Sequence, residues 1–205
     1  MAEIEGPRCK RILLKLSGEA LAGPDKTGIN PEIINQIATE IKEVSDLGVE
    51  VALVIGAGNI FRGAMADSLG ISRSTGDFMG MLATVMNSMA VENTLEKMNK
   101  STRVLTAIEM KHVAEPYTIQ KALDHLKKGR IVIAAGGTGH PYFTTDTAAS
   151  LRAVELGADV LLKATRVDGV YTGDPEKDPD AKKIVEIPYI EMIKQQLRVM
   201  DLTAI

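Results

Sequence analysis

The chain has 205 residues, with 24 Lys and Arg against 27 Asp and Glu and a formal net charge of −3. That length fits one large domain or two small ones closely joined. Proteins that coat nucleic acid or bind membrane surfaces through clustered cations carry a basic excess, which this chain lacks. Four Tyr, three Phe and no Trp are too few for a base-stacking platform. We therefore expect neither a nucleic-acid nor a membrane partner.

The cysteine and histidine content limits the possible sites. One cysteine, Cys9, excludes an internal disulfide, and one thiol with three scattered histidines cannot close a zinc site. No apolar run approaches the roughly 20 residues that span a bilayer, and residues 1–11 lack the apolar stretch of a signal peptide. We expect a cytoplasmic protein without a metal site of its own.

Short apolar runs alternate with helical patterns in the first half of the chain. Residues 11–16 predict a strand and residues 23–28 a Gly-rich loop. Residues 30–48 predict a helix that begins at an Asn cap followed by Pro and ends at Gly. Residues 49–55 predict a strand whose near-continuous apolar character is typical of a parallel sheet buried on both faces. A long helix is expected at about residues 77–97.

The long helix carries an apolar stripe of Met81, Leu82, Val85, Met86 and Met89. A stripe at this spacing is more typical of a core or a subunit interface than of a cofactor contact, and we interpret it in that way.

The second half continues the same alternation. The predicted strands are 104–107, 131–135 and 160–163, the predicted helices are 117–128 and 145–156, and residues 166–180 predict a loop. Strands and helices that alternate along a whole chain predict an α/β fold with a mainly parallel sheet.

The last residues, 199–205, look like a helix that begins at an Asp cap and stops on an apolar residue. Chain ends are more often polar and frayed. We therefore expect residues 1–205 to form a single domain that lacks its C-terminal helix and strand.

Four predicted turns carry the residues that could do chemistry. They are Lys15-Leu16-Ser17-Gly18, residues 56–63, residues 136–146 and residues 163–174. Ligands of parallel sheets bind beyond the carboxyl ends of the strands, so all four turns should meet at one edge. Glycines there let backbone N–H groups approach phosphate oxygens, and the helices that follow offer positive N-terminal ends.

Two familiar phosphate motifs are not matched. No segment has the P-loop pattern, and Phe61 stands where the dinucleotide fingerprint needs its third glycine or alanine. Gly56-x-Gly58, taken alone, is equally consistent with a plain tight turn.

Two cations in these turns are candidate phosphate ligands. Lys15 lies in an otherwise apolar strand, where its charge would be desolvated unless an anion pairs with it. The alternative is an edge-strand lysine that faces solvent. Arg62 follows a glycine turn, where its planar guanidinium suits bidentate contact with phosphate. Its alternative is a surface arginine in a salt bridge.

Residues 136–146, Gly-Gly-Thr-Gly-His-Pro-Tyr-Phe-Thr-Thr-Asp, are the most informative stretch. Three glycines, three threonine hydroxyls and a predicted helix N-terminus at Thr144 or Thr145 form an anion pocket of neutral donors. Asp146 in the first helical turn would repel an anion. It is either a simple complement to the helix dipole, or it orients Lys15 or a magnesium-bound water.

Five segments are distinctive when they are read together in chain order. They are Lys15-Leu16-Ser17-Gly18-Glu19-Ala20-Leu21, Gly58-Asn59-Ile60-Phe61-Arg62-Gly63, Gly76-Asp77-Phe78-Met79-Gly80-Met81-Leu82-Ala83-Thr84, Phe143-Thr144-Thr145-Asp146 and Lys163-Ala164-Thr165-Arg166-Val167-Asp168-Gly169-Val170-Tyr171. Together they resemble the bacterial uridylate (UMP) kinases of the amino-acid kinase superfamily, from about Lys10 to the last residue.

This resemblance implies a three-layer α/β/α sandwich, the amino-acid kinase fold, and transfer of the γ-phosphoryl group of MgATP to UMP in pyrimidine nucleotide biosynthesis. Lys15, Arg62 and Asp146 would be catalytic. ATP would be bound by Lys15, Leu16, Ser17, Gly18, Gly58, Arg62, Thr165, Tyr171 and Asp174. UMP would be bound by Ala57, Asp77, Thr138, Gly139, His140, Pro141, Tyr142, Phe143, Thr144 and Thr145. Asp77 would accept from the ribose hydroxyls, and its alternative role is to cap the long helix.

The chain departs from the family pattern at two site positions. Ala57 replaces the usual third glycine of a Gly-Gly-Gly-Asn turn, which is harmless only if its φ stays negative. His140 stands where the family often has Asn, which leaves the contact with the base open.

The resemblance also implies a homohexamer, inhibition by UTP and, in many members, activation by GTP. GTP-activated members tend to have basic residues where this chain has Glu92 and Glu96. Two acids would repel GTP, although Arg103 and Arg130 remain. GTP activation therefore stays open.

Two other functions are consistent with parts of the pattern. A sister kinase that acts on a carboxylate or carbamate would share the fold and the ATP half of the site, but Asp77 and residues 138–146 weigh against it. A nucleotide-responsive binding protein without turnover, similar to the molybdenum-storage proteins, would not need Lys15, Arg62, Asp77 and Asp146 together.

Overall fold

The computed structural model describes residues 7–165, 167, 169–173, 175, 177–178, 180–195, 197 and 199–205. Its main sheet has six strands in the order β4-β3-β5-β2-β1-β6. The strands are β1 (Arg11–Leu16), β2 (Glu50–Ile55), β3 (Thr102–Thr106), β4 (Glu115–Pro116), β5 (Ile131–Ala135) and β6 (Val160–Lys163). Each neighbouring pair runs parallel, which confirms the predicted sheet.

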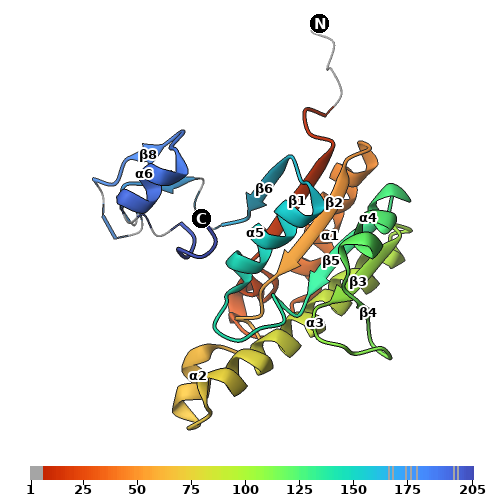
Figure 1. Cartoon of the computed structure of the whole chain (residues 1–205), viewed down its shortest axis with the longest axis horizontal. Coiled ribbons are helices and arrows are strands. Elements are labelled where there is room, and N and C mark those ends of the chain that lie inside the picture. Colours follow the sequence, from red (N-terminus) through yellow and green to blue (C-terminus); the bar gives the residue numbers. More distant parts are fainter. Residues whose placement is uncertain are drawn as a thin grey trace, which may run out of the picture.

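Helices cover both faces of this sheet (Figure 1). Helices α1 (Pro31–Asp46) and α3 (Arg73–Lys97) pack on one face, and α4 (Ile119–Lys127) and α5 (Thr145–Leu156) pack on the other. Alternate strand residues serve the two cores: Leu53 belongs to the α1 and α3 side and Val54 to the α4 and α5 side. The expected three-layer sandwich is confirmed.

Side-chain caps set the helix starts. Asn30 accepts from the backbone N–H groups of Glu32 and Ile33, and Thr144 accepts from those of Asp146 and Thr147. Helix α3 begins at Arg73, four residues before the predicted start, because Ser72 caps it. Asp77 is therefore not the cap of the long helix, and that alternative is wrong.

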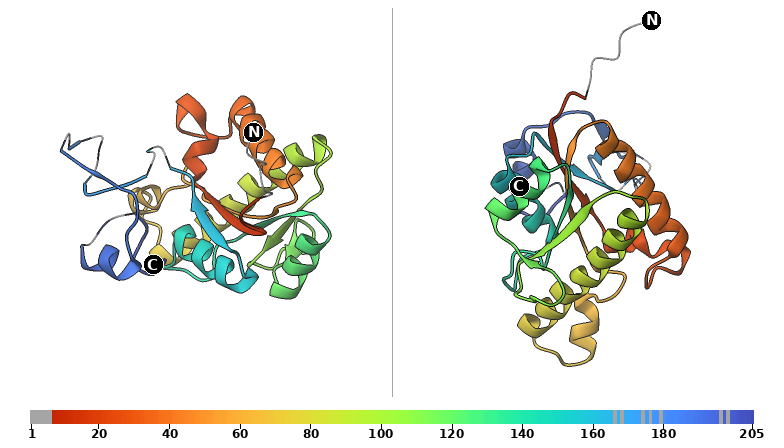
Figure 2. Two further views of the ribbon diagram at one scale, coloured as in Figure 1. Left: turned by 90° about the horizontal axis from the view of Figure 1, so that it is seen from above. Right: turned by 90° about the vertical axis from the view of Figure 1, so that its right-hand side faces the viewer.

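Several short elements were not predicted. Residues 63–68 form helix α2 (Gly63–Ser68), and the predicted loop after β6 contains β7 (Val170–Tyr171), which pairs antiparallel with β8 (Lys183–Ile184). The chain also has the short helix α6 (Tyr189–Lys194) and two 3-10 turns, η1 (Gly18–Leu21) and η2 (Gly23–Asp25). The small sheet and α6 lie to one side of the sandwich (Figure 2).

The predicted C-terminal helix is wrong. Residues 202–204 form a turn instead. That turn lies against α5, because the Ser150 hydroxyl donates to the Ala204 carbonyl and the Thr147 and Thr203 hydroxyls lie 2.6 Å apart. Contacts with another element, and not a local helical pattern, hold these residues.

The apolar stripe of α3 is only partly core. Met81 and Val85 are buried, whereas Leu82, Met86 and Met89 are 43%, 55% and 43% exposed. Met81 and Val85 belong to the core, and the interpretation as a subunit interface stays open for the exposed Leu82, Met86 and Met89. No helix among the described residues is long and apolar enough to cross a membrane.

Candidate active site

Lys15 forms a buried ion pair at the carboxyl end of β1. Strand β1 lies between β2 and β6, and Lys15 is 8% exposed, so the edge-strand alternative is wrong. Its Nζ lies 2.6 Å from Oδ1 of Asp146 in the first turn of α5. The two charged groups form an ion pair. The anion that pairs with Lys15 in this structure is thus supplied by the protein.

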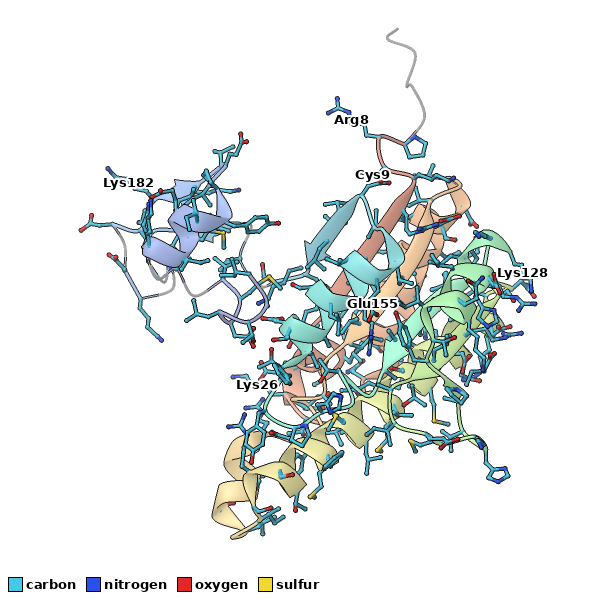
Figure 3. The ribbon with its side chains drawn as sticks, in the orientation of Figure 1. Arg8, Cys9, Lys26, Lys128, Glu155 and Lys182 are labelled. Atoms are coloured by element: carbon cyan, nitrogen blue, oxygen red, sulfur yellow. The ribbon has the colours of Figure 1, made fainter. Side chains whose placement is uncertain are left out.

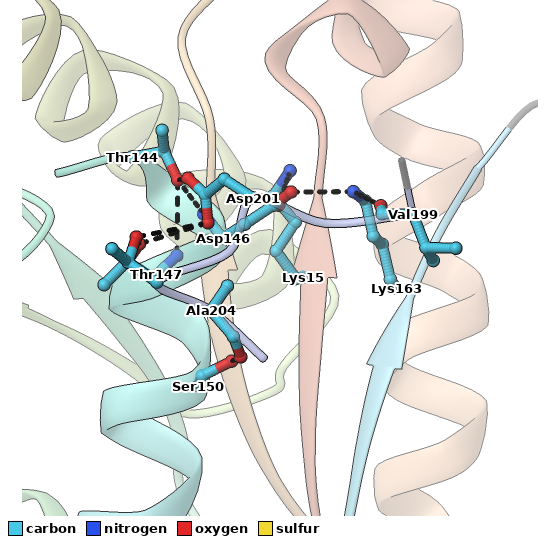
Figure 4. A network of polar contacts seen from close by, with 10 residues as sticks. Lys15, Thr144, Asp146, Thr147, Ser150, Lys163, Val199, Asp201 and Ala204 are labelled. Atoms are coloured by element: carbon cyan, nitrogen blue, oxygen red, sulfur yellow. Dashed lines mark hydrogen bonds and ion pairs between the residues drawn. The ribbon is translucent and has the colours of Figure 1, made fainter. Parts of the chain in front are cut away.

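A second lysine shares the same carboxylate. The register of β1 and β6 places Lys163 beside Lys15, and Lys163 Nζ donates to Oδ2 of Asp146 at 2.7 Å (Figure 4). Burial raises the pKa of Asp146, but the two lysines outweigh burial and hold that pKa below its ordinary value. Asp146 therefore stays ionised and positions both ammonium groups, in agreement with the orienting role predicted toward Lys15.

Lys163 was missed as a site residue, although the sequence held a signal for it. Both β1 and β6 are apolar runs with a lysine at or next to their last residue. Parallel strands that are neighbours bring such residues together, but the sequence does not say which strands are neighbours.

The turns after β1 and β2 touch each other. Leu16 is buried, Ser17 precedes η1, and the Gly56 N–H donates to the Leu16 carbonyl at 2.8 Å. A Cβ at Gly18 would lie 2.5 Å from Asn59 Oδ1 and 2.6 Å from the Gly56 carbonyl oxygen. Position 18 must therefore be glycine for this close approach.

Ala57 and Gly58 lie in the second of these turns. Ala57 is not among the residues with positive φ, so its methyl group causes no backbone strain there. Because the turn approaches Gly18 closely, the backbones that follow β1 and β2 lie side by side.

Arg62 makes contacts within the protein and remains accessible. Its Nε donates to the Gly58 carbonyl at 2.8 Å, and its guanidinium lies 3.0 Å from a Glu19 carboxylate oxygen. The salt bridge of the alternative interpretation is therefore present. The side chain is still 48% exposed, and a cavity of about 720 Å³ that Gly58 also lines opens beside it. An incoming phosphate could take the place of Glu19.

The turn after β5 is held by hydrogen bonds at its glycines. Gly136 has φ +75°, and its N–H donates to Oγ1 of the buried Thr84 at 2.9 Å. Thr145 lies close to the β2 turn, because a Cβ at Gly56 would sit 3.4 Å from its Oγ1. The N-terminus of α5 thus lies next to the turn after β2 and the turn after β5.

Asp201 also contacts the α5 N-terminus and was missed as a site residue. It accepts from the hydroxyls of Thr144 and Thr147, and the nearby Val199 carbonyl accepts from Lys163 (Figure 4). The sequence signal for Asp201 is an acid near the end of the chain, where the local pattern predicts a helix cap.

Asp77 lies in α3 and contacts the loop between β5 and α5. It pairs with Arg73 at 2.9 Å, and its Oδ2 accepts from the Tyr142 N–H at 2.7 Å. Tyr142 itself has φ +73°. The other predicted UMP residues follow the same loop: His140, Phe143 and Thr144 are exposed, and Thr138, Gly139, Pro141 and Thr145 are partly buried.

The predicted residues around the ATP nucleoside are not joined to this cluster in the same way. Thr165 follows β6, and its hydroxyl donates to the Val167 carbonyl at 2.6 Å. Tyr171 lies in β7, which belongs to the separate two-stranded sheet. Asp174 lies outside the described residues.

Taken together, the site is suited to anions of high charge. Two lysines share one carboxylate, and Arg62 and the glycine turns add further donors. No three His, Cys, Asp or Glu residues in the described part of the chain are grouped as metal ligands. Cys9 lies before the amino end of β1, far from Lys26, which lines the same cavity as Arg62 (Figure 3).

Comparisons with known proteins agree with this geometry. Residues 10–205 match the model of the amino acid kinase family. A UMP kinase from Bacillus anthracis is 43% identical, covers 96% of this chain and 81% of its own, and superposes with a TM-score of 0.93. A UMP kinase from Ureaplasma parvum is 38% identical over 97% and 84% of the two chains, with a TM-score of 0.91. A uridylate kinase from Archaeoglobus fulgidus is 30% identical over 94% and 83%, with a TM-score of 0.71.

The lowered pKa of Asp146 predicts how stability depends on pH. Its carboxylate stabilises the fold above the ordinary carboxyl pKa of about 3.9, and this contribution is lost as pH falls through the lowered pKa. In Asp146→Asn the two lysines lose their anion, which costs about 3 kcal/mol near neutral pH. The melting temperature of the variant should therefore fall less on acidification than that of the parent.

Thermal denaturation between about pH 7 and pH 2 measures this difference. Asp25→Asn removes the same charge at an exposed position and should follow the parent curve. An equal acid-side fall in the parent and in Asp146→Asn would contradict the prediction.

Proposed function

The chain belongs to the amino acid kinase family, and we propose that it is a UMP kinase, which transfers the γ-phosphoryl group of ATP to UMP and gives UDP and ADP. The observation that carries this proposal is the buried cluster of Lys15, Asp146 and Lys163 at the strand ends, beside two glycine turns. The solved relatives support UMP as the acceptor.

The chemistry of the acceptor suits a site without a strong base. The second pKa of a phosphate monoester is near 6, so the attacking oxygen of UMP is already largely ionised at neutral pH. The enzyme must hold two phosphates in line and offset their mutual repulsion. Lysines, an arginine and backbone N–H groups do that without accepting a proton.

Asp146 acts through the two lysines in this proposal. Because it holds both ammonium groups at 2.6 and 2.7 Å, they are already placed when the nucleotides bind. A charge that is held in place before reaction stabilises the transition state without further reorganisation. Arg62 would complete the arrangement from the opposite turn by exchanging Glu19 for phosphate.

ATP enters with Mg²⁺, which supplies further neutralisation of its phosphates. Mg²⁺ is usually held by one or two carboxylates and by substrate phosphates. Both oxygens of Asp146 already contact lysines, so the donor set fits an ion carried mainly by the nucleotide. Asp146 would at most contact a water of that ion.

The remaining parts of the proposal concern assembly and regulation. We place the enzyme in pyrimidine nucleotide biosynthesis in the cytoplasm, as a homohexamer inhibited by UTP. The exposed Leu82, Met86 and Met89 of α3 support an interface between subunits, because large apolar side chains gathered on one helix face favour burial.

The first test is whether ADP formation depends on UMP. We expect ADP only when ATP, Mg²⁺ and UMP are all present, and Lys15→Ala should lower kcat by about 10²-fold, since a positioned cation contributes on the order of 3 kcal/mol. A coupled ADP assay measures both effects. Lys128→Ala removes a lysine far from the site and should turn over normally (Figure 3).

Two outcomes would overturn the assignment. Turnover with a carboxylate or carbamate in place of UMP would indicate the sister-kinase function, and near-normal kcat in a folded Lys15→Ala variant would remove Lys15 from catalysis.

Asp77 should govern the affinity for the nucleoside. If its carboxylate accepts from the ribose hydroxyls, Asp77→Asn should raise KM for UMP about 10-fold, because one hydrogen bond to a charged group is weakened. Arg73→Ala removes the ion pair with Asp77 but leaves its carboxylate, so KM for UMP should change little. Steady-state kinetics with UMP varied would decide this, and equal effects of the two substitutions would speak against ribose binding.

GTP should not activate this enzyme. Glu96 pairs with Arg103 at 2.9 Å, and Glu92 accepts from the Val104 N–H and lines a cavity of about 560 Å³ that Arg103 also lines. Glu92 and Glu96 would repel a triphosphate. Glu96 also already pairs with Arg103, the cation that would otherwise attract it. A GTP titration of the initial rate should be flat, whereas Glu96→Gln, which frees Arg103, should show more response. A strong stimulation of the parent would contradict this prediction.

A further inference from the structure

Four polar side chains of helix α3 are buried, and three of them lie close together near its middle. Thr84, Asn87 and Ser88 are 3%, 0% and 0% exposed, and we refer to them as the α3 polar stripe. A buried polar group is costly unless it is hydrogen-bonded. Each of the three is bonded, but they differ in what they hold.

Asn87 holds the turn after β2. Its Nδ2 donates to the Gly56 carbonyl at 2.8 Å, and a carbonyl can only accept, which fixes the orientation of the amide. The same Nδ2 donates to Asn59 Oδ1 at 2.8 Å, and Asn87 Oδ1 accepts from Asn59 Nδ2 at 3.1 Å. Asn59 Nδ2 also donates to the Gly28 carbonyl. This reciprocal amide pair joins the turn to α3 and to the loop before α1.

Thr84 holds the turn after β5. Its Oγ1 accepts from the Gly136 N–H at 2.9 Å and donates to the Met81 carbonyl at 2.6 Å. The hydroxyl group therefore both accepts and donates a hydrogen bond, and these two partners fix its orientation. Gly136 has φ +75°, so its own backbone offers little resistance to movement.

Ser88 differs from its two neighbours. Its hydroxyl donates to the Thr84 carbonyl at 2.7 Å, which lies within α3 itself. It is as deeply buried as Asn87 but contacts neither glycine turn through its hydroxyl. It therefore separates the effect of holding a turn from that of filling the core.

We propose that Asn87 and Thr84 are positioning residues for phosphoryl transfer, which hold the two glycine turns at the separation that in-line reaction requires. The inference rests on the proposed function. Glycine turns are conformationally permissive, whereas a shift of about 1 Å between reacting groups costs on the order of 10²-fold in rate. The two side chains supply the rigidity that the turns lack.

This role predicts a change in kcat more than in KM. The glycine turns would hold the reacting phosphates, while the nucleosides would be bound elsewhere, by residues such as Asp77. A loosened turn should therefore let both nucleotides bind but align them poorly.

The test compares Asn87→Ala with Ser88→Ala. We expect Asn87→Ala to lower kcat about 10²-fold, with KM for ATP and UMP within about threefold of the parent, because alignment and not binding is lost. Ser88→Ala should leave kcat within about twofold. Melting temperatures of both variants show whether they are folded at the assay temperature.

A second pair of variants avoids the risk that Asn87→Ala fails to fold. Thr84→Val keeps the shape of the side chain but cannot accept from Gly136, and it should lose kcat, whereas Thr84→Ser keeps the hydroxyl and should restore most of it. Equal kcat in Thr84→Val and Thr84→Ser, or losses in Ser88→Ala as large as in Asn87→Ala, would overturn the inference. A parent protein without UMP-dependent turnover would instead overturn the proposed function, and this inference with it.

Discussion

The structure depends on one carboxylate shared by two lysines. Asp146 lies between Lys15 and Lys163, and the buried Lys15 depends on this carboxylate to offset its loss of water. Their meeting needs the register of β1 with β6, and it needs α5 to begin at the same edge of the sheet. A chain that failed to begin α5 at this edge would leave the buried Lys15 without an anion, and one that failed to bring β6 beside β1 would remove the second lysine from Asp146.

An acidic protein can hold anions because most of its donors carry no formal charge. The net charge is −3, yet the edge that contains Lys15 and Lys163 combines these cations with several glycine turns. Backbone N–H groups and a helix N-terminus attract phosphate through partial charges. Only a few cations are then needed where negative charge is most concentrated. The rest of the surface is free to stay acidic.

Much of this fold could be predicted from the sequence where the signal is local. Strands β1, β5 and β6 and helix α5 have the predicted bounds, because apolar runs that stop at Gly or a polar residue, and a Thr cap, act within a few residues. Helix α2 and the β7 and β8 pair are too short for periodicity to show. A lysine at the end of an apolar run is a local signal for Lys163, but its partner depends on which strands are neighbours. Asp201, Asn87 and the C-terminal turn depend on contacts far along the chain, which no local pattern indicates.

The spacing of Thr84 and Asn87 has a further meaning. They are three residues apart on α3, which is about 4.5 Å along a helix axis at 1.5 Å per residue. One of them bonds to the turn after β2 and the other to the turn after β5. A regular helix is a rigid element, and here it sets the distance between two glycine turns whose own backbone is permissive. The glycine turns are thus positioned by a helix, α3, that need not contact the substrates at Thr84 or Asn87.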